Sequence, residues 1–391
     1  MQMKSLLLVL FAVFAGATFG APEAQVTKIE SEGLSPEWIK VSYTLSGDAV
    51  VTAEFYSDGV KIPDAKATRL FGDVNRKVAA TESGQVRSFR WAVGAELGSD
   101  RETVRQGAQL SVKLTAWPLE NPPLYMAVSL QATNVVRYYA TEAGVPGGVT
   151  NARWKTGWML LRHIHARNVP WMMGSPTGES GRGADETLHP VLLTKDYYIG
   201  IYPVTQRQCQ VATGARTSYA DGFEKNADCD YYPVNAWGFS SVTEVFLPKF
   251  RAIAKLDLDF PSEAEWEFAC RAGTTTPYCF GTESDAYGKM WNGDGNQKTT
   301  AVDRFPANAW GLYGMHGGIR EFCRDRYADY PTTGKTAVDP VGSLTDGNVI
   351  VRGGSYASIA PACRSAARAT TDASTASWDY GFRLMAPAVA R

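Results

Sequence analysis

The chain has 391 residues, more than a single hydrophobic core usually holds, so two domains are expected. Its 39 lysine and arginine residues almost balance its 40 acidic residues, which leaves a net charge of −1. This balance provides no basic surface for nucleic acid or for an anionic membrane, so neither is an expected partner.

The first twenty residues have the layout of a secretory signal peptide. Lys4 precedes an apolar run from Leu6 to Phe14, and the small residues Thr18, Gly20 and Ala21 follow. The apolar run is too short for a comfortable membrane span, and no stop-transfer segment follows it. We therefore predict a signal peptide over residues 1–20, cleavage near Gly20, and export to the periplasm or the extracellular space without an integral membrane segment. An uncleaved N-terminal anchor is the alternative.

Residues 21–130 alternate between apolar and polar side chains in short bursts that are typical of half-buried strands. Turn sequences separate the bursts, and no segment has a convincing helical period. We predict an all-β sandwich of the immunoglobulin or fibronectin type, which serves as a packing or spacer module because it contains no cysteine and no histidine. The clearest bursts are WIKVSYTL (38–45), VVTAEFYS (50–57), VRSFRWAV (86–93) and LSVKLTAW (110–117).

The composition changes near residue 125, after which glycine, tryptophan, tyrosine and proline become frequent. Capping sequences predict three helix starts in this second part, and Pro248 is expected to interrupt or end the second helix. In the third helix Trp266, Ala269 and Cys270 share one face, Glu263 and Glu267 point elsewhere, and Gly273 supplies the stop. The three capping pairs are Thr205 with Gln208, Ser241 with Glu244, and Ser262 with Glu265.

The cysteine and histidine pattern excludes the usual structural zinc sites. No C-x-x-C pair occurs, and the chain has only four histidines. An even number of cysteines in an exported protein predicts disulfides. The cysteines are Cys209, Cys229, Cys270, Cys279, Cys323 and Cys363.

Seven stretches that occur in one order make the second part resemble the sulfatase-modifying-factor family, whose members have formylglycine-generating-enzyme-like domains. The resemblance covers residues from about 150 to 387 and implies an α+β fold with C-type-lectin-like topology and much irregular structure. We assign this domain to residues 131–391. The stretches are MMGSPTGE (172–179), YIGIYPVTQRQ (198–208), YYPVNAWGF (231–239), FPSEAEWEFACRAG (260–273), NAWGLYGMHGGIREF (308–322), VRGGSY (351–356) and GFRL (381–384).

In the oxidase members of this family, two cysteines in the loop after a glycine pair bind copper(I) and, with dioxygen, convert a substrate cysteine into formylglycine. Here Ser358 stands at the first of these positions, and Cys363 is the candidate for the second, although the loop to Arg368 is shorter. Ser355 matches a serine that lines the oxidase pocket. A serine hydroxyl is a hard ligand that cannot replace a copper(I) thiolate, so copper is doubtful. We expect Cys363 to form a disulfide, with a buried free thiol as the alternative.

The expected function is therefore an exported family member that lacks the paired-cysteine copper site and acts in binding or in an unassigned activity. The alternative is a formylglycine-generating oxidase with a non-standard copper site, formed around Cys363, Ser355 and Ser358, that acts on a protein or peptide such as a sulfatase. Whether the chain is an enzyme stays open.

The resemblance also implies metals that other members hold. Structural calcium is bound through oxygen ligands in loops, for which Asn292 and Glu321 are the candidates here. A second branch of the family uses an iron held by three histidines. His163 and His165, two apart on a predicted strand, make only an incomplete site, so packing or surface roles are expected for them.

Four arginines are expected to form structural ion pairs rather than to recognise a substrate, because guanidinium groups form planar bidentate contacts with carboxylates. The arginines are Arg352, Arg364, Arg368 and Arg383, and the acids expected near them are Glu263, Glu265, Glu321 and Asp325.

Overall fold

The computed structural model describes most of the chain. The predicted signal peptide and the candidate calcium ligand Asn292 lie outside the described residues. These comprise residues 21–31, 37–67, 69–98, 104, 110–214, 227–283, 299–332 and 334–388.

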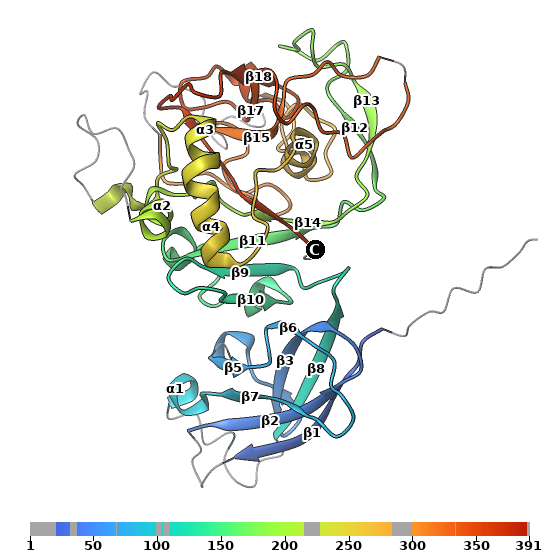
Figure 1. Ribbon diagram of the computed structural model, residues 1–391, viewed down its shortest axis with the longest axis vertical. Coiled ribbons are helices and arrows are strands. Elements are labelled where there is room, and N and C mark those ends of the chain that lie inside the picture. Colours follow the sequence, from blue (N-terminus) through green and yellow to red (C-terminus); the bar gives the residue numbers. More distant parts are fainter. Residues whose placement is uncertain are drawn as a thin grey trace, which may run out of the picture.

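The N-terminal strands gather at one end of the molecule in two antiparallel sheets (Figure 1). One sheet has the order β1-β2-β7-β5, and the other has the order β4-β3-β6 with β8 paired to β3. All four strands predicted from alternation are confirmed as β2, β3, β7 and β8. The strand bounds are β1 (Ala24–Ser31), β2 (Ile39–Leu45), β3 (Ala49–Ser57), β4 (Val60–Lys61), β5 (Leu70–Gly72), β6 (Arg76–Val78), β7 (Arg87–Trp91) and β8 (Leu110–Pro118).

Both N-terminal sheets contribute to one apolar core. Val41 of β2, Phe55 of β3 and Trp91 of β7 are buried in the same cluster. A short helix, α1 (Val93–Leu97), follows β7, although no helix is expected there from the sequence. Glu96 fixes it, because its carboxylate accepts hydrogen bonds from the Trp91 indole at 2.7 Å and from a backbone N–H at 2.8 Å. These sheets do not by themselves establish the immunoglobulin or fibronectin type, which stays a prediction.

The second part of the chain contains three further sheets (Figure 1). Their orders are β10-β9-β11-β14-β20, β12-β13-β16 and β18-β17-β15-β19. The composition change near residue 125 coincides with the start of β9. The bounds are β9 (Tyr125–Ser129), β10 (Val136–Tyr139), β11 (Trp158–Ile164), β12 (Pro170–Met173), β13 (His189–Leu192), β14 (Tyr197–Gly200), β15 (Arg320–Arg326), β16 (Ala337–Val338), β17 (Val349–Arg352), β18 (Arg368–Thr371), β19 (Tyr380–Gly381) and β20 (Met385–Pro387).

Two of the three predicted helix starts are confirmed. The helices α2 (Gln206–Thr213) and α5 (Glu263–Arg271) both begin with a complete capping box, in which the cap hydroxyl and the third residue exchange hydrogen bonds. Trp266, Ala269 and Cys270 are buried on α5 as expected. Short 3-10 turns connect the larger elements, namely η1 (Asp64–Lys66), η3 (Glu142–Gly144), η4 (Ala152–Lys155), η5 (Ala227–Tyr231) and η7 (Ala360–Cys363).

The predicted start at Ser241 is wrong. Ser241 already has helical backbone angles and makes no capping hydrogen bond, because α3 (Phe239–Ser241) begins after Gly238. The chain continues through a π-helical segment, η6 (Val242–Phe246), into α4 (Leu247–Ala254). Pro248 therefore lies in the first turn of α4 instead of ending the helix. A proline removes an N–H and crowds the preceding turn, and the widened π turn is where the helix accommodates it.

None of the helices in the described part of the chain has the length and apolar character needed to cross a bilayer.

Candidate functional site

The loop that carries the candidate residues starts at a glycine pair after β17. Gly353 and Gly354 have φ angles of 88° and 67°, a region that side-chain-bearing residues rarely adopt. A Cβ atom on Gly354 would lie 2.5 Å from the Cys363 sulfur, so the pair also allows the loop to fold closely on itself. The loop packs against a second glycine-rich loop, because the Gly317 N–H donates to the Gly353 carbonyl at 2.7 Å.

The two candidate serines are buried and hydrogen bonded. The Ser358 hydroxyl oxygen accepts from the Ser355 N–H at 2.9 Å and from the Arg320 guanidinium at 3.2 Å. The Ser355 hydroxyl donates to the Asp379 carboxylate at 3.0 Å and lies 3.2 Å from the Ser358 hydroxyl. Arg320 and Asp379 are themselves 3.3 Å apart. These four residues form a closed polar cluster, to which the sequence contributed only the two serines.

Cys363 lies in the same loop, and its thiol is free in the structure, so the expected disulfide is not present. The side chain is fully buried, and this burial raises the pKa of the thiol to about 12. Cys270 of α5 is equally buried, and burial raises the pKa of its thiol to about 12 as well. Both groups are therefore protonated at neutral pH. With Ser358 in place of the first family cysteine, this donor set does not fit a copper(I) ion that requires two convergent thiolates.

His316 connects the cysteine-bearing segments. Its Nε2 accepts a hydrogen bond from the Cys279 N–H at 3.1 Å, so the ring hydrogen is placed on Nδ1, which donates to the Cys363 carbonyl at 2.8 Å. The Cys270 sulfur lies 3.6 Å from Nε2. Three cysteine-bearing segments therefore meet around one buried imidazole. The sequence gives no local signal for this arrangement, because the three contacts come from residues 37, 46 and 47 positions away.

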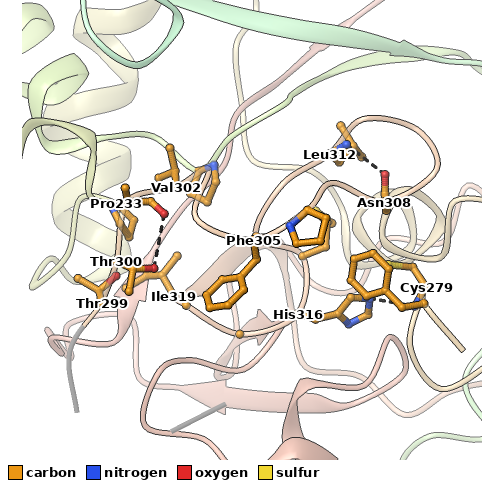
Figure 2. A pocket seen from close by; sticks show the side chains of 18 residues that line it. Pro233, Cys279, Thr299, Thr300, Val302, Phe305, Asn308, Leu312, His316 and Ile319 are labelled. Carbon is orange, nitrogen blue, oxygen red and sulfur yellow. Dashed lines mark hydrogen bonds between the residues drawn. The ribbon is translucent and has the colours of Figure 1, made fainter. Parts of the chain in front are cut away.

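His316 also lines a pocket (Figure 2). Phe305 occupies the middle of the view, with His316 and Cys279 on one side of it and Thr299 and Thr300 on the other. The hollow measures about 510 Å³, including the open solvent at its mouth. Its wall combines apolar side chains with a few polar groups, as is common in ligand sites.

Cys279 and Cys363 differ in exposure, and this difference provides a test of the closed candidate loop. With iodoacetamide at pH 8, Cys279, which is partly exposed, should be alkylated first, and Cys363 at least ~100-fold more slowly, because thiolate formation and access both limit the reaction. The Cys363 rate should continue to rise up to about pH 10, since its pKa is about 12. Peptide mapping measures both rates, and the denatured chain, in which all cysteines react alike, is the control. Equal native rates at the two sites would contradict the closed loop.

Glu321, the candidate calcium ligand, has its carboxylate occupied by other groups. Its two oxygens accept from Arg383 at 2.8 and 3.0 Å, and the Trp266 indole N–H donates to one of them at 2.7 Å. A fixed guanidinium beside both oxygens opposes a second cation, so Glu321 as placed does not fit calcium. Calcium bound elsewhere in the chain stays a prediction.

Each of the other three arginines is also ion paired. Arg364 contacts Glu186 at 2.7 Å, and Arg368 forms a two-pronged contact with Glu263 at 2.8 and 2.9 Å. Arg352 pairs with Glu267, which is fully buried. Glu263 and Glu267 are both buried, and both pair with arginines. The helix turns them toward arginines that the sequence places about 100 residues later.

The family of the second part follows from a direct match. Residues 162–388, more than half of the chain, match the family described as sulfatase-modifying factor enzyme 1-like domain. The chain belongs to this family. Among curated relatives, it is 34% identical to the formylglycine-generating enzyme of Mycobacterium tuberculosis over 157 residues, which cover 33% of this chain and 51% of that protein. The corresponding enzyme of Streptomyces coelicolor is 34% identical over 145 residues, which cover 32% of this chain and 45% of that protein.

Other family relatives carry different names. The serine/threonine-protein kinase pkn1 of Chlamydia caviae is 34% identical over 127 residues, which cover 32% of this chain and 20% of that protein. These alignments span about half or less of the curated relatives. Among solved structures, Treponema denticola variable protein 1 matches with a TM-score of 0.52 and 24% identity, covering 59% of this chain and 95% of that one. PvdO from Pseudomonas aeruginosa matches with a TM-score of 0.51 and 25% identity, covering 59% of this chain and 94% of that one. These two structures support the shared fold.

Proposed function

We propose that this chain is an exported sulfatase-modifying-factor protein that binds a segment of another protein without oxidising it. One observation carries the proposal: the hydroxyl of Ser358 stands at the first cysteine position and is held by Ser355 and Arg320. A hydroxyl in this place cannot supply the soft thiolate that copper(I) requires. The candidate loop then offers only Cys363, one thiolate fewer than this copper(I) site requires.

The pocket beside His316 is the proposed binding site. Residues 314–319 of one glycine-rich loop line it, and the Gly317 N–H of this loop donates to the Gly353 carbonyl of the candidate loop. Phe305 and Ile319 offer apolar contact, and Thr299 and Thr300 offer hydroxyl groups. An extended peptide suits this mixture, because its backbone requires hydrogen bonds while its side chains enter apolar recesses. The description of the family as sulfatase-modifying makes a sulfatase the first partner to test.

The rival function is a formylglycine-generating oxidase with a non-standard copper site. One observation favours it: Cys279 is a partly exposed thiol that lines the pocket next to His316. In that case the reactive thiol would be Cys279 rather than Cys363.

The remaining parts of the account are proposals of the same kind. Residues 1–20 act as a signal peptide for export to the periplasm or the extracellular space. Residues 21–130 form an immunoglobulin-like sandwich that serves as a spacer, and residues 131–391 form the family domain. The two antiparallel N-terminal sheets around one core support the sandwich assignment.

The proposal is tested with a sulfatase-type cysteine peptide. We expect the chain to bind the labelled peptide in a fluorescence-anisotropy titration and to leave its mass unchanged in the presence of copper(I) and dioxygen. Phe305→Ala should weaken the binding about tenfold or more, since it removes an aromatic ring from the pocket wall. Absence of binding would contradict the proposed ligand, and conversion of the peptide would favour the rival.

A further inference from the structure

Two histidines and an aspartate meet where β11 ends and β14 begins, away from the pocket. His163 lies in β11, and His165 follows the end of this strand. Asp196 precedes β14. Because β11 and β14 are antiparallel, with Ile164 opposite Tyr197, the three residues are brought side by side.

The donor atoms of these residues converge. The Asp196 Oδ2 atom lies 3.7 Å from the His163 Nε2 atom and 3.8 Å from the His165 Nδ1 atom. One donor atom from each residue can be chosen so that all three lie within 4.8 Å of one another. The ligands of a tetrahedral zinc ion at ~2.1 Å lie about 3.4 Å apart, so a small inward movement completes the geometry.

The ring nitrogens of His163 are buried polar atoms, one of which a bound metal ion would satisfy. Its side chain is 0% exposed, and neither of its ring nitrogens has a hydrogen-bond partner in the described part of the chain. Leaving a buried polar group unpaired costs about 1–3 kcal/mol.

Two backbone N–H groups hold the Asp196 carboxylate in place beside the histidines. Its Oδ1 atom accepts from the Ala166 N–H at 2.8 Å and the Arg167 N–H at 2.7 Å. These bonds fix the carboxylate and direct Oδ2 toward the two imidazoles, as supporting hydrogen bonds do around metal ligands. The His165 side chain is 63% exposed, so an ion can enter from solvent and keep a water molecule in its fourth position.

We propose that His163, His165 and Asp196 form a binding site for a divalent transition-metal ion, with Zn²⁺ as the ion that its donors suit best. Two imidazoles and one carboxylate favour Zn²⁺ and its neighbours over Ca²⁺ and Mg²⁺, which prefer oxygen ligands. The site adjoins the segment that leads from the N-terminal sheets, because the His163 N–H donates to the Leu124 carbonyl at 2.8 Å. A bound ion would therefore clamp β11 and β14 near the junction between the two parts of the chain.

The test uses the purified chain without an affinity tag. Competition with a chromophoric chelator measures Zn²⁺ affinity, and the visible absorption of Co²⁺ reports the coordination geometry. We expect one ion per chain, and an increase in thermal stability with Zn²⁺ but not with Mg²⁺, since a ligand of the folded state stabilises it.

Two variants locate the ion. Asp196→Asn keeps an oxygen that accepts the two backbone N–H bonds but removes the carboxylate charge, and His165→Ala changes an exposed side chain. Each should raise the Zn²⁺ dissociation constant at least ~10-fold and abolish the Co²⁺ absorption. Lys195→Ala, an exposed neighbour of Asp196, is the matched control and should bind as the unchanged chain does. Less than one equivalent of Zn²⁺, or an affinity that neither ligand variant lowers, would overturn the proposal.

Discussion

Arg383→Met is expected to lower the free energy of unfolding by about 3–5 kcal/mol, because it leaves the buried Glu321 carboxylate without its cation. The guanidinium of Arg383 also donates to the carbonyls of Gly200 and Tyr313 at 2.7 and 2.6 Å, so the substitution leaves these acceptors unpaired as well. Urea denaturation followed by circular dichroism measures the loss.

Two further variants show whether the stability loss of Arg383→Met comes from the burial of the ion pair or from the removal of a charge alone. Arg251→Met removes a partner of Asp259 at 3.2 Å, where the side chains are 43% and 31% exposed, and should cost no more than about 1 kcal/mol. The double variant with Arg383→Met and Glu321→Gln should recover part of the loss, since it removes the uncompensated charge. Equal losses for Arg383→Met and Arg251→Met would contradict the structural role of the buried pair.

Gly354→Ala should lower the free energy of unfolding by about 2–4 kcal/mol, the second largest expected effect. Alanine is strained at the left-handed φ of 67°, and its Cβ would lie 2.5 Å from the Cys363 sulfur and 2.9 Å from the Ala362 carbonyl oxygen. The candidate loop would have to move. Urea denaturation gives the loss, and faster alkylation of Cys363 would report the displaced loop.

Gly318→Ala is the matched control for Gly354→Ala. Gly318 has a similar φ of 82°, but a Cβ there meets no atom within 4 Å. It should cost only the backbone strain, about 1–2 kcal/mol. Equal decreases in the free energy of unfolding for the two alanine variants would show that the close packing of Gly354 against Cys363 does not contribute to stability.

The sequence predicted those parts of the fold that depend on local patterns. Alternation located β2, β3, β7 and β8, and capping boxes located α2 and α5, because both signals arise within a few residues. Ser241 failed as a cap since a serine followed by glutamate three residues later can also occur inside a helix that has already begun. The pairing of Glu263 with Arg368 lies within the predicted set of ion pairs, whereas Glu267 was not predicted as the partner of Arg352, which belongs to a distant strand.

The sequence predicted the candidate site only in part, because many of its contacts join residues that are far apart in the chain. Family resemblance placed Ser355, Ser358 and Cys363 in one loop, but the sequence did not show that Ser358 is bonded to Arg320, 38 residues away. The expected disulfide of Cys363 required a partner whose position the sequence does not give. Asp196, more than thirty residues from His163, changed an incomplete histidine pair into a three-donor cluster.

The most direct test of the central claim is the mass of a sulfatase-type cysteine peptide after incubation with the chain, copper(I) and dioxygen. An active formylglycine-generating enzyme under the same conditions is the positive control, and circular dichroism confirms that the chain is folded. We predict an unchanged peptide, because Ser358 and a protonated, buried Cys363 do not provide two thiolates. Conversion of the cysteine to the aldehyde at a rate that depends on copper would contradict this account and identify the chain as an oxidase.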